Sequence, residues 1–243
     1  MEVSVSVRMN EYQQPVGEPM ENWSPRQRPG PVTLKGRFCR LEPLDSAGHF
    51  ADLYEAYGKA GDGRDWTYMF TGPFADEQQF HGHLNAAATS SDAVYYAVID
   101  LSSGRAVGTL ALMRIEPAHG VIEVGQVAFS PDLKRTPVST EAHFLLMTYA
   151  IEQLGYRRYE WKCDSLNAPS RRAAERLGFI YEGLFRQAIV YKGRTRDTTW
   201  FSIIDADWPA VRAGFERWLD PANFDSQGQQ KKSLAALRDQ AGS

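Results

Sequence analysis

Residues 161–179, WKCDSLNAPSRRAAERLGF, couple the end of a strand to the start of a short helix. The strand is predicted at 156–165 and the helix at 168–178, where a glycine ends it. Asn167 and Ser170 lie at the beginning of the helix, where short polar side chains commonly cap unpaired backbone N–H groups. The stretch therefore predicts a strand–helix unit with a defined start and a defined end.

A second strand-to-helix junction lies at 133–146, LKRTPVSTEAHFLL. Thr136 is placed to cap this helix, with Pro137 at the first helical position, where its missing N–H costs little. A helix N-terminus presents unpaired amides and the positive end of the helix dipole, so it suits a pyrophosphate. A plain, well-capped helix explains the same sequence, and this stretch alone leaves both interpretations open. The residues that would hold such a ligand are Lys134, Arg135, Thr136, Pro137, Val138, Ser139 and Thr140.

Hydrophobic periodicity and turn residues divide the rest of the chain into further elements. Strands are predicted at 36–44, 94–100, 105–115, 120–131 and, as a long hairpin, 181–204, and helices at 45–60, 75–90, 137–154 and 207–219. This order predicts one mixed α/β domain over residues 37–219. Residues 1–36 are predicted to form an extended arm, and the polar tail 220–243 to be disordered after Asp225.

The helix motif resembles that of a known superfamily. Residues 167–170 and 177–179 match the pattern Asn-x-x-(Ala/Ser)…Leu-Gly-Phe, which follows the fifth strand in the GNAT superfamily of acyl-coenzyme A N-acyltransferases. The pyrophosphate loop of that superfamily usually reads Gln/Arg-x-x-Gly-x-Gly/Ala. In this chain Lys134 stands at its first position, Pro137 at the glycine and Ser139 at the last small residue.

The resemblance covers roughly residues 36–219 and is strongest to the RimJ/RimL branch of ribosomal-protein N-terminal acetyltransferases, which shares the hairpin entry at 181–188. It implies an α/β (α+β) GNAT fold, with a mixed, mostly antiparallel sheet of about seven strands flanked by helices and splayed between strands 4 and 5. It also implies acetyl-CoA as the acyl donor and a primary amine as the acceptor, which attacks the thioester directly.

In such a fold the fourth strand would leave backbone groups free to pair with the pantetheine arm of coenzyme A as an extra strand. The same N–H groups would polarise the thioester carbonyl and stabilise the oxyanion. The residues that the resemblance assigns to the cofactor are Gln126, Val127, Ala128 and Phe129 on the strand, and Asn167, Ser170 and Arg171 on the following helix.

Proton transfer requires a base for the substrate ammonium and an acid for the leaving thiolate. Glu123 is the predicted base, because it stands on the fourth strand in an otherwise apolar run; a salt-bridged glutamate is the alternative. RimL-like enzymes have a candidate base on the late hairpin, but Ile189 occupies that position here. Ala174 replaces the tyrosine acid of many GNAT enzymes. Ser170 and Tyr181 are therefore the candidate acids; the alternatives are that Ser170 is a helix cap and that the Tyr181 ring packs in the core.

The charge of the chain is unevenly distributed, with acidic residues in excess over 40–100 and basic residues in excess over 134–196. Aromatic and acidic groups in the loop between the first two helices would suit a cationic amine, such as an aminoglycoside antibiotic or a polyamine. The RimJ/RimL resemblance favours a protein N-terminus instead. The candidate acceptor site consists of Asp65, Trp66, Tyr68 and Phe70, together with Glu123.

A non-catalytic acyl-CoA-binding sensor is the competing class, because Pro137, Ala174 and Ile189 all depart from the family's patterns. The sequence also leaves a homodimer possible.

Composition argues against several other classes of protein. A net charge of −3 over 243 residues lacks the dense basic face of a nucleic-acid binder, and no apolar run has the length of a membrane span. The start of the chain does not resemble a signal peptide, so the cytoplasm is the expected location. Cys39 and Cys163 are too few for a disulfide framework. His81 and His83 have no further ligand cluster, so no metal is predicted.

Overall fold

A single sheet forms the centre of the fold in a computed structural model of the chain, which describes residues 8–58 and 61–240. The strand order is β3-β4-β5-β6-β7-β8-β10-β9. Neighbouring strands are antiparallel except β7 and β8, which are parallel. This confirms the predicted mixed, mostly antiparallel sheet, to which the short β3 adds an eighth strand. The strands are β3 (Leu34–Lys35), β4 (Cys39–Pro43), β5 (Val94–Asp100), β6 (Ala106–Glu116), β7 (Val121–Phe129), β8 (Arg158–Asp164), β9 (Ile180–Tyr191) and β10 (Arg194–Ile204).

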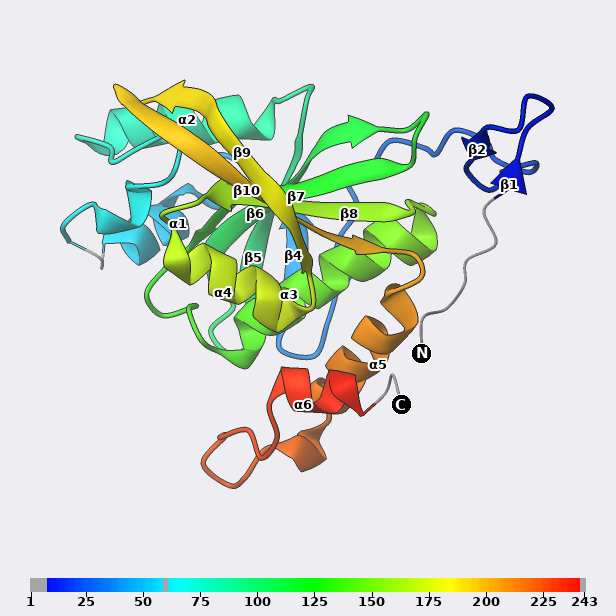
Figure 1. The fold of residues 1–243 in the computed structure, drawn as a ribbon. Helices are drawn as coiled ribbons and strands as arrows, with labels where there is room; N and C mark the ends of the chain where they lie inside the picture. Colours follow the sequence, from blue (N-terminus) through cyan, green and yellow to red (C-terminus); the bar gives the residue numbers. More distant parts are fainter. Residues whose placement is uncertain (1–7, 59–60, 241–243) are drawn as a thin grey trace.

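Helices cover both faces of this sheet, as Figure 1 shows. On one face α1 (Phe50–Gly58) and α2 (Glu77–Ala88) cover β4 to β6. The other face carries α3 (Pro137–Thr148), α4 (Ala168–Leu177) and α5 (Trp208–Leu219), with α6 (Leu234–Asp239) packed on α4 and α5. Short helical turns lie at η1 (Arg64–Trp66), η2 (Tyr149–Gln153) and η3 (Pro221–Asn223). No helix in the described part of the chain is long and apolar enough to cross a bilayer.

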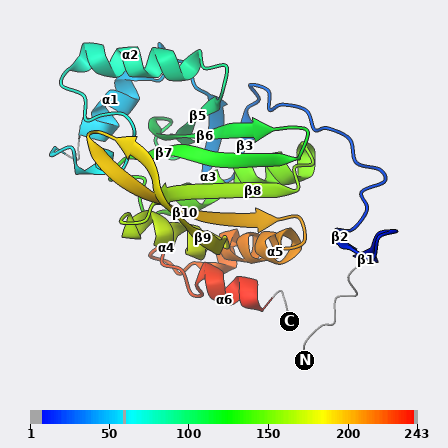
Figure 2. The same ribbon diagram turned by 45° about the horizontal axis from the view of Figure 1, so that its top comes forward.

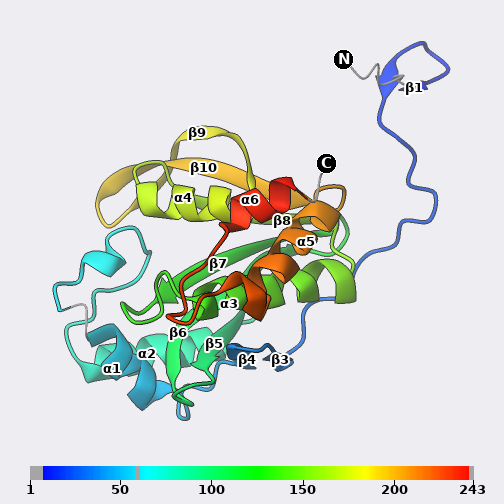
Figure 3. The same cartoon turned by 90° about the horizontal axis from the view of Figure 1, so that it is seen from below.

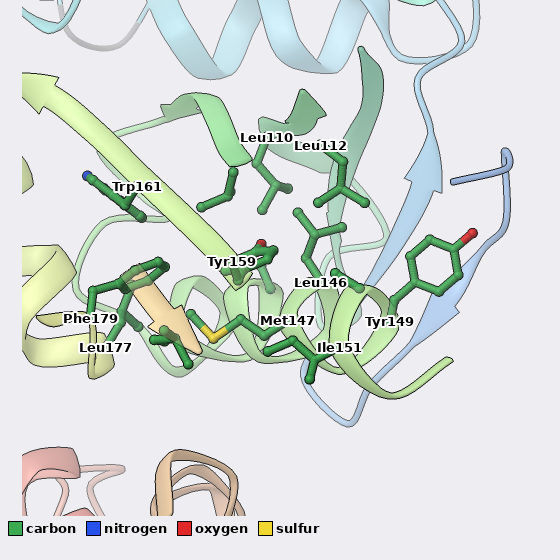
Figure 4. Close-up of a cluster of buried hydrophobic side chains, with 14 of the residues drawn as sticks. Leu110, Leu112, Leu146, Met147, Tyr149, Ile151, Tyr159, Trp161, Leu177 and Phe179 are labelled. Carbon is green, nitrogen blue, oxygen red and sulfur yellow. The ribbon is translucent and has the colours of Figure 1, made fainter. Parts of the chain in front are cut away.

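The larger hydrophobic core lies between the sheet and α3, α4 and α5 (Figure 4). Leu110 and Leu112 on β6 and Leu146 and Met147 on α3 are all fully buried there. Burying one such side chain stabilises a fold by about 1.5–3 kcal/mol. The apolar face of α3 therefore sets how this helix lies against the sheet.

One buried carboxylate ties α3 to the first long strand. The two oxygens of Glu141 accept the backbone N–H groups of residues 37, 38 and 39 at 2.8, 2.6 and 2.8 Å. A Cβ at Gly36 would overlap this carboxylate, so a larger residue there would force Glu141 to move from its three backbone N–H groups. The bonds hold the start of β4 against α3.

The N-terminal arm is bound to the body of the molecule over part of its length. Tyr96 and Tyr156 donate their hydroxyls to the carbonyls of Gly30 and Gln27 at 3.1 and 3.0 Å, and Gly30 donates its N–H to the Tyr149 hydroxyl at 3.0 Å. Three core tyrosines thus hold the extended segment 27–30. Residues farther toward the N-terminus form the hairpin of β1 (Arg8–Met9) and β2 (Pro15–Val16), which stands away from the body in Figures 1 and 3.

The C-terminal residues differ from the predicted disordered tail. Ser233 accepts the N–H of Ala236 and caps α6, and Leu234 and Leu237 are buried against the neighbouring helices. Gly214 on α5 permits this contact, because a Cβ there would lie 2.9 Å from the Cα of Arg238. Two leucines in a polar run are a weak sequence signal, and their burial depends on contact with α4 and α5.

Candidate active site

The gap between β7 and β8 is the central feature of the site. The two strands pair from Val121 and Arg158 as far as Val124 and Trp161, and the pairing then ends. Beyond this point β7 keeps only its β6 partner, so backbone groups facing β8 have no strand to pair with. This confirms the predicted splay between the fourth and fifth long strands. Figure 2 shows β7 and β8 as neighbours in the middle of the sheet.

A bulge marks the place where β7 leaves β8. Gln126 has a left-handed backbone, with φ of 51°, and the register against β6 shifts between Gly125 and Ala128. Such a conformation is uncommon for a residue other than glycine, and bulges often re-aim a strand next to a functional site. The carbonyl of Ala128 accepts the Tyr57 hydroxyl at 2.9 Å. The candidate residues Gln126 to Phe129 thus form a bent, partly anchored edge at the gap.

The N-terminus of α3 is capped as the sequence predicts. Thr136 accepts the N–H of Ser139 at 3.2 Å, and Pro137 stands in the first turn. The hydroxyl of Ser139 donates to the Thr136 carbonyl at 2.8 Å, and the buried Thr140 hydroxyl accepts Arg176 Nη1 at 3.1 Å. Both side chains are thus engaged within the fold. The N–H of Val138 has no hydrogen-bond acceptor among the described residues, so it remains free for a ligand.

A buried histidine lies between the parting strands. His143 on α3 is 4% exposed, with its ring 5.5 Å from that of Phe129 on β7 and 5.3 Å from that of Trp161 on β8. Burial, together with the charge of Arg176, lowers the pKa of His143 to about 3. Its ring is therefore neutral, and its Nδ1 atom has no partner within the described residues.

Charged side chains form a row on the α1/α2 face of the sheet, beside the gap. Glu123 on β7 stands opposite Glu160 on β8, and Lys162 Nζ lies between them, 2.9 Å from Glu123 Oε2 and 2.6 Å from Glu160 Oε2. The Trp200 ring covers this ammonium at 3.6 Å, and Arg114 Nε is 3.2 Å from Glu123. Burial raises the pKa of Glu123, and the charges of Lys162 and Arg114 oppose that rise. Glu123, the predicted base, is therefore salt-bridged, which was the alternative interpretation of this residue in the sequence.

The loop between α1 and α2 forms one wall of a pocket of about 70 Å³ beside the gap. Asp65 binds Lys134 Nζ at 2.5 Å, so these two predicted site residues neutralise each other. Trp66 is 7% exposed, and it packs edge-on against Tyr57 and Phe74 in the hydrophobic core. The residues that line this pocket are Tyr57, Asp65, Trp66, Val127, Ala128, Phe129 and Lys134.

The turn between β9 and β10 holds the same loop from the other side. Lys192 donates to the carbonyls of Trp66, Thr71 and Gly72 at 2.7, 3.1 and 2.5 Å. Arg194 donates to the Thr67 carbonyl at 2.6 Å. The loop and the hairpin thus form one wall, although they are far apart in the sequence.

Two further loop residues contact neighbouring elements. The Tyr68 hydroxyl donates to the Leu166 carbonyl at 3.2 Å, and the half-exposed Phe70 ring lies 5.5 Å from the ring of Tyr191. Tyr191 in turn donates its hydroxyl to Asp164 at 2.7 Å, and burial together with this acceptor raises its pKa to about 12.

The candidate acids occupy different places. Asn167 caps α4 by accepting the N–H of Ser170 at 3.2 Å, and Ser170 Oγ accepts Trp161 Nε1 at 3.0 Å near the gap. Tyr181 lies on β9, two strands beyond β8, with its ring 5.5 Å from that of Phe201. Its register places it on the face opposite Glu123, so the structure does not bring Tyr181 to the gap. Arg171 is exposed and donates to the Ser165 carbonyl at 3.4 Å.

Of the charged row, only Glu123 was predicted from the sequence, although a signal for the others was present. In β8, the charged residues Arg158, Glu160, Lys162 and Asp164 alternate with the apolar or aromatic residues Tyr159, Trp161 and Cys163. This period of two shows that one face of a central strand is polar. Trp200 and Arg196 carry no such signal, because their neighbours depend on the order of the strands.

The described residues contain no group of three or more His, Cys, Asp or Glu side chains placed to hold a metal ion. His81 instead bonds Asn85 at 3.1 Å, and the His83 ring stacks on Phe74 at 4.9 Å.

Residues 39–180 match the acetyltransferase (GNAT) domain family. A GCN5-related N-acetyltransferase from Brucella melitensis has a crystal structure that is 49% identical, with a TM-score of 0.89 over 90% of this chain and 100% of its own. The uncharacterized N-acetyltransferase p20 from Bacillus licheniformis is 28% identical over 148 residues, which are 58% of this chain and 80% of its own. A putative ribosomal N-acetyltransferase from Bacillus subtilis is 27% identical over 108 residues, 44% of this chain and 58% of its own.

The parted strands and the capped helix next to them define a fold that can receive an extended ligand along a strand edge. The chain belongs to the GNAT acetyltransferase family, whose members generally take the acetyl group from acetyl-CoA. The residues present fit that donor, because the β7 edge is unpaired toward β8 and the amide of Val138 is free.

Proposed function

We propose that this enzyme transfers an acetyl group from acetyl-CoA to a primary amine, which attacks the thioester directly. The single observation that carries the proposal is the unpaired edge of β7 from Gly125 to Phe129, next to the N-terminus of α3. Backbone groups on that edge would pair with the pantetheine arm as a strand would. When bound, acetyl-CoA supplies an acetyl group activated as a thioester.

Phosphate binding falls to the start of α3 and its loop. The free amide of Val138 and the positive end of the helix dipole would hold the diphosphate. Lys134 and Arg135 would add positive charge, and Lys134 would have to exchange Asp65 for the ligand. Thr136 and Pro137 serve chiefly to start the helix and so to aim its amides.

Proton transfer falls to the charged row. Glu123 would accept the proton of the incoming ammonium, directly or through water, and Lys162 would keep the carboxylate in place and charged. Ser170 Oγ accepts the Trp161 indole N–H, so its own hydroxyl proton is free. It would donate this proton to the departing thiolate and take a replacement proton from solvent.

A peptide or protein N-terminus is the acceptor class that we favour. A relative is described as a putative ribosomal N-acetyltransferase, which agrees with a peptide acceptor. Aminoglycosides and polyamines remain the second acceptor class.

The test is a thiol-release assay with acetyl-CoA and a panel of short peptides, aminoglycosides and polyamines. We expect turnover on peptides, and a large loss of kcat in Glu123→Gln with coenzyme A binding retained. Turnover on aminoglycosides alone would contradict the peptide assignment. Binding of coenzyme A without thiol release from any amine would instead establish the alternative, a non-catalytic sensor of acyl-CoA.

A further inference from the structure

Arg196 is a buried guanidinium that the proposed reaction does not use. It lies on β10 and is 6% exposed. Its Nε donates to the Thr198 hydroxyl at 3.1 Å, and this is the one hydrogen bond that the Arg196 side chain makes among the described residues. No ion pair joins Arg196 to any carboxylate of residues 8–58 or 61–240. A buried cation without a counter-charge is costly, because water no longer solvates it fully.

Two aromatic rings fix the position of this guanidinium. Its Cζ lies 5.3 Å from the centre of the Phe70 ring and 5.8 Å from that of Tyr191. Cation–π contact of this kind favours a guanidinium and restrains its plane. Phe70 comes from the α1–α2 loop and Tyr191 from the end of β9. Arg196 therefore lies where this loop meets the β9–β10 hairpin, the two parts of the wall beside the gap.

The tip of Arg196 remains available to a ligand. Neither Nη1 nor Nη2 of Arg196 makes a hydrogen bond within the described residues. Neither atom is fully buried. Both nitrogens therefore keep contact with solvent. The nearby carboxylate of Asp164 is already engaged, because its oxygens accept the Tyr191 hydroxyl and the Leu166 N–H.

Contacts place this side chain on the same face as the proposed base, although a bulge lies between Arg196 and Thr198. Thr198 stands opposite Asp164 and Trp200 opposite Lys162. Arg196 Nε bonds the Thr198 hydroxyl, and Tyr191 contacts both Arg196 and Asp164.

Two strand spacings separate β7 from β10, which is about 10 Å across the sheet. Along β10, Arg196 lies six residues, or about 20 Å, from Ser202, the residue level with Glu123. Arg196 is therefore near the end of the gap that lies beyond Asp164, and an acceptor whose amine lies at that end, with Glu123 reached through water, could contact Arg196 with a group several bonds away.

We propose that Arg196 binds a carboxylate of the acceptor, so that the enzyme selects amines that also carry a carboxylate, such as amino acids and short peptides. A guanidinium fork with two free nitrogens matches a planar carboxylate in a bidentate pair. The inference rests on the proposed function, since it names a chemical class of acceptor for the same site.

The first test compares matched acceptors in the wild-type enzyme. Dipeptides and ω-amino acids with a free carboxylate are assayed by thiol release against the same molecules as C-terminal amides. We expect kcat/KM to be about 10- to 100-fold higher for the acids, mostly through KM. Equal kcat/KM for acid and amide would overturn the proposal, and this comparison does not depend on any variant folding.

The second test uses Arg196→Met and Arg196→Lys. We expect Arg196→Met to lose the preference for acids and to keep its activity on the amides, with Arg196→Lys intermediate because it keeps the charge and loses the fork. Arg217→Met, an exposed arginine on α5, is the matched control and should behave as wild type. An unchanged acid-to-amide ratio in Arg196→Met would contradict the assignment.

Failure of this inference can be separated from failure of the proposed function. Coenzyme A binding by calorimetry reports on the gap between β7 and β8, which Arg196 does not touch. Calorimetry with the N-acetylated dipeptide reports on Arg196 without any turnover. Coenzyme A binding with equal affinity for the acetylated acid and its amide would reject the carboxylate site alone.

Discussion

Replacing Lys162 by methionine removes a positive charge from between two buried carboxylates and keeps most of the side-chain volume. The ammonium is 2.9 Å from Glu123 and 2.6 Å from Glu160, and each of these three side chains is 7% exposed. Glu123 and Glu160 stand directly opposite each other on β7 and β8. Without Lys162, two like charges would face each other in a site that water reaches poorly.

The expected cost follows from this geometry. Breaking a buried ion pair by removing one partner typically lowers the free energy of unfolding by about 3–5 kcal/mol. Arg114 and Arg158 still contact the two carboxylates, so we expect about 3 kcal/mol for Lys162→Met at pH 8. The pKa of Glu123, already raised by burial, should rise further, because the charge of Lys162 no longer opposes that rise.

The sign of the pH dependence can be stated in advance. A carboxylate whose pKa is higher in the folded than in the unfolded state binds more protons when the protein is folded. Its contribution to stability is therefore fully present below the unfolded pKa. This contribution is lost as pH rises through the folded pKa. The variant should therefore be least destabilised near pH 5 and most at pH 8. If Glu123 is the base, the acid limb of the pH–rate profile should move to higher pH by the same shift in pKa.

Urea unfolding at pH 5 and pH 8, followed by far-UV circular dichroism, measures these differences. Lys35→Met, at an exposed lysine on β3, is the matched control and should change stability by no more than about 0.5 kcal/mol. Lys162→Arg should recover part of the loss because it restores the charge. A loss below about 1 kcal/mol that is the same at both pH values would refute the buried charge cluster, since exposed pairs behave in that way.

Three further changes test the packing around the site. Glu141→Gln replaces a carboxylate that accepts three backbone N–H groups of residues 37–39, and urea unfolding should show a loss of about 2–4 kcal/mol. Tyr149→Phe removes the acceptor of the Gly30 N–H; we expect about 1 kcal/mol and faster proteolysis of the arm, and unchanged proteolysis would argue against the bond. Leu237→Ala should cost about 2–3 kcal/mol if α6 is packed as described, whereas a disordered tail would give no change in thermal unfolding.

Much of the fold was accessible from the sequence, because its signals are local. Periodicity located the strands and helices of the domain in their observed order. Thr136 with Pro137, and Asn167, were identified as helix starts, since a cap needs only residues within one turn. The helix motif at 161–179 then pointed to the family, and the family implied the splay of β7 and β8.

Other features depend on contacts between distant segments. Tyr181 was a candidate acid in the sequence, but the strand order β8-β10-β9 places it two strands from the gap. Asp65 was expected to attract an amine, yet the fold brings Lys134 onto it. The C-terminal tail was expected to be disordered after Asp225, but residues 234–239 form α6, which packs on α4 and α5.

The sequence by itself determined the elements, their order, the helix caps and the family, because these follow from residues that are neighbours along the chain. Only the tertiary structure decided that Lys162 lies between two glutamates under Trp200, and that Arg196 is buried against Phe70 and Tyr191. Burial and charge pairing are set by the register between strands and by loops folded over them. A one-dimensional pattern does not specify which side chains, many residues apart, share that space.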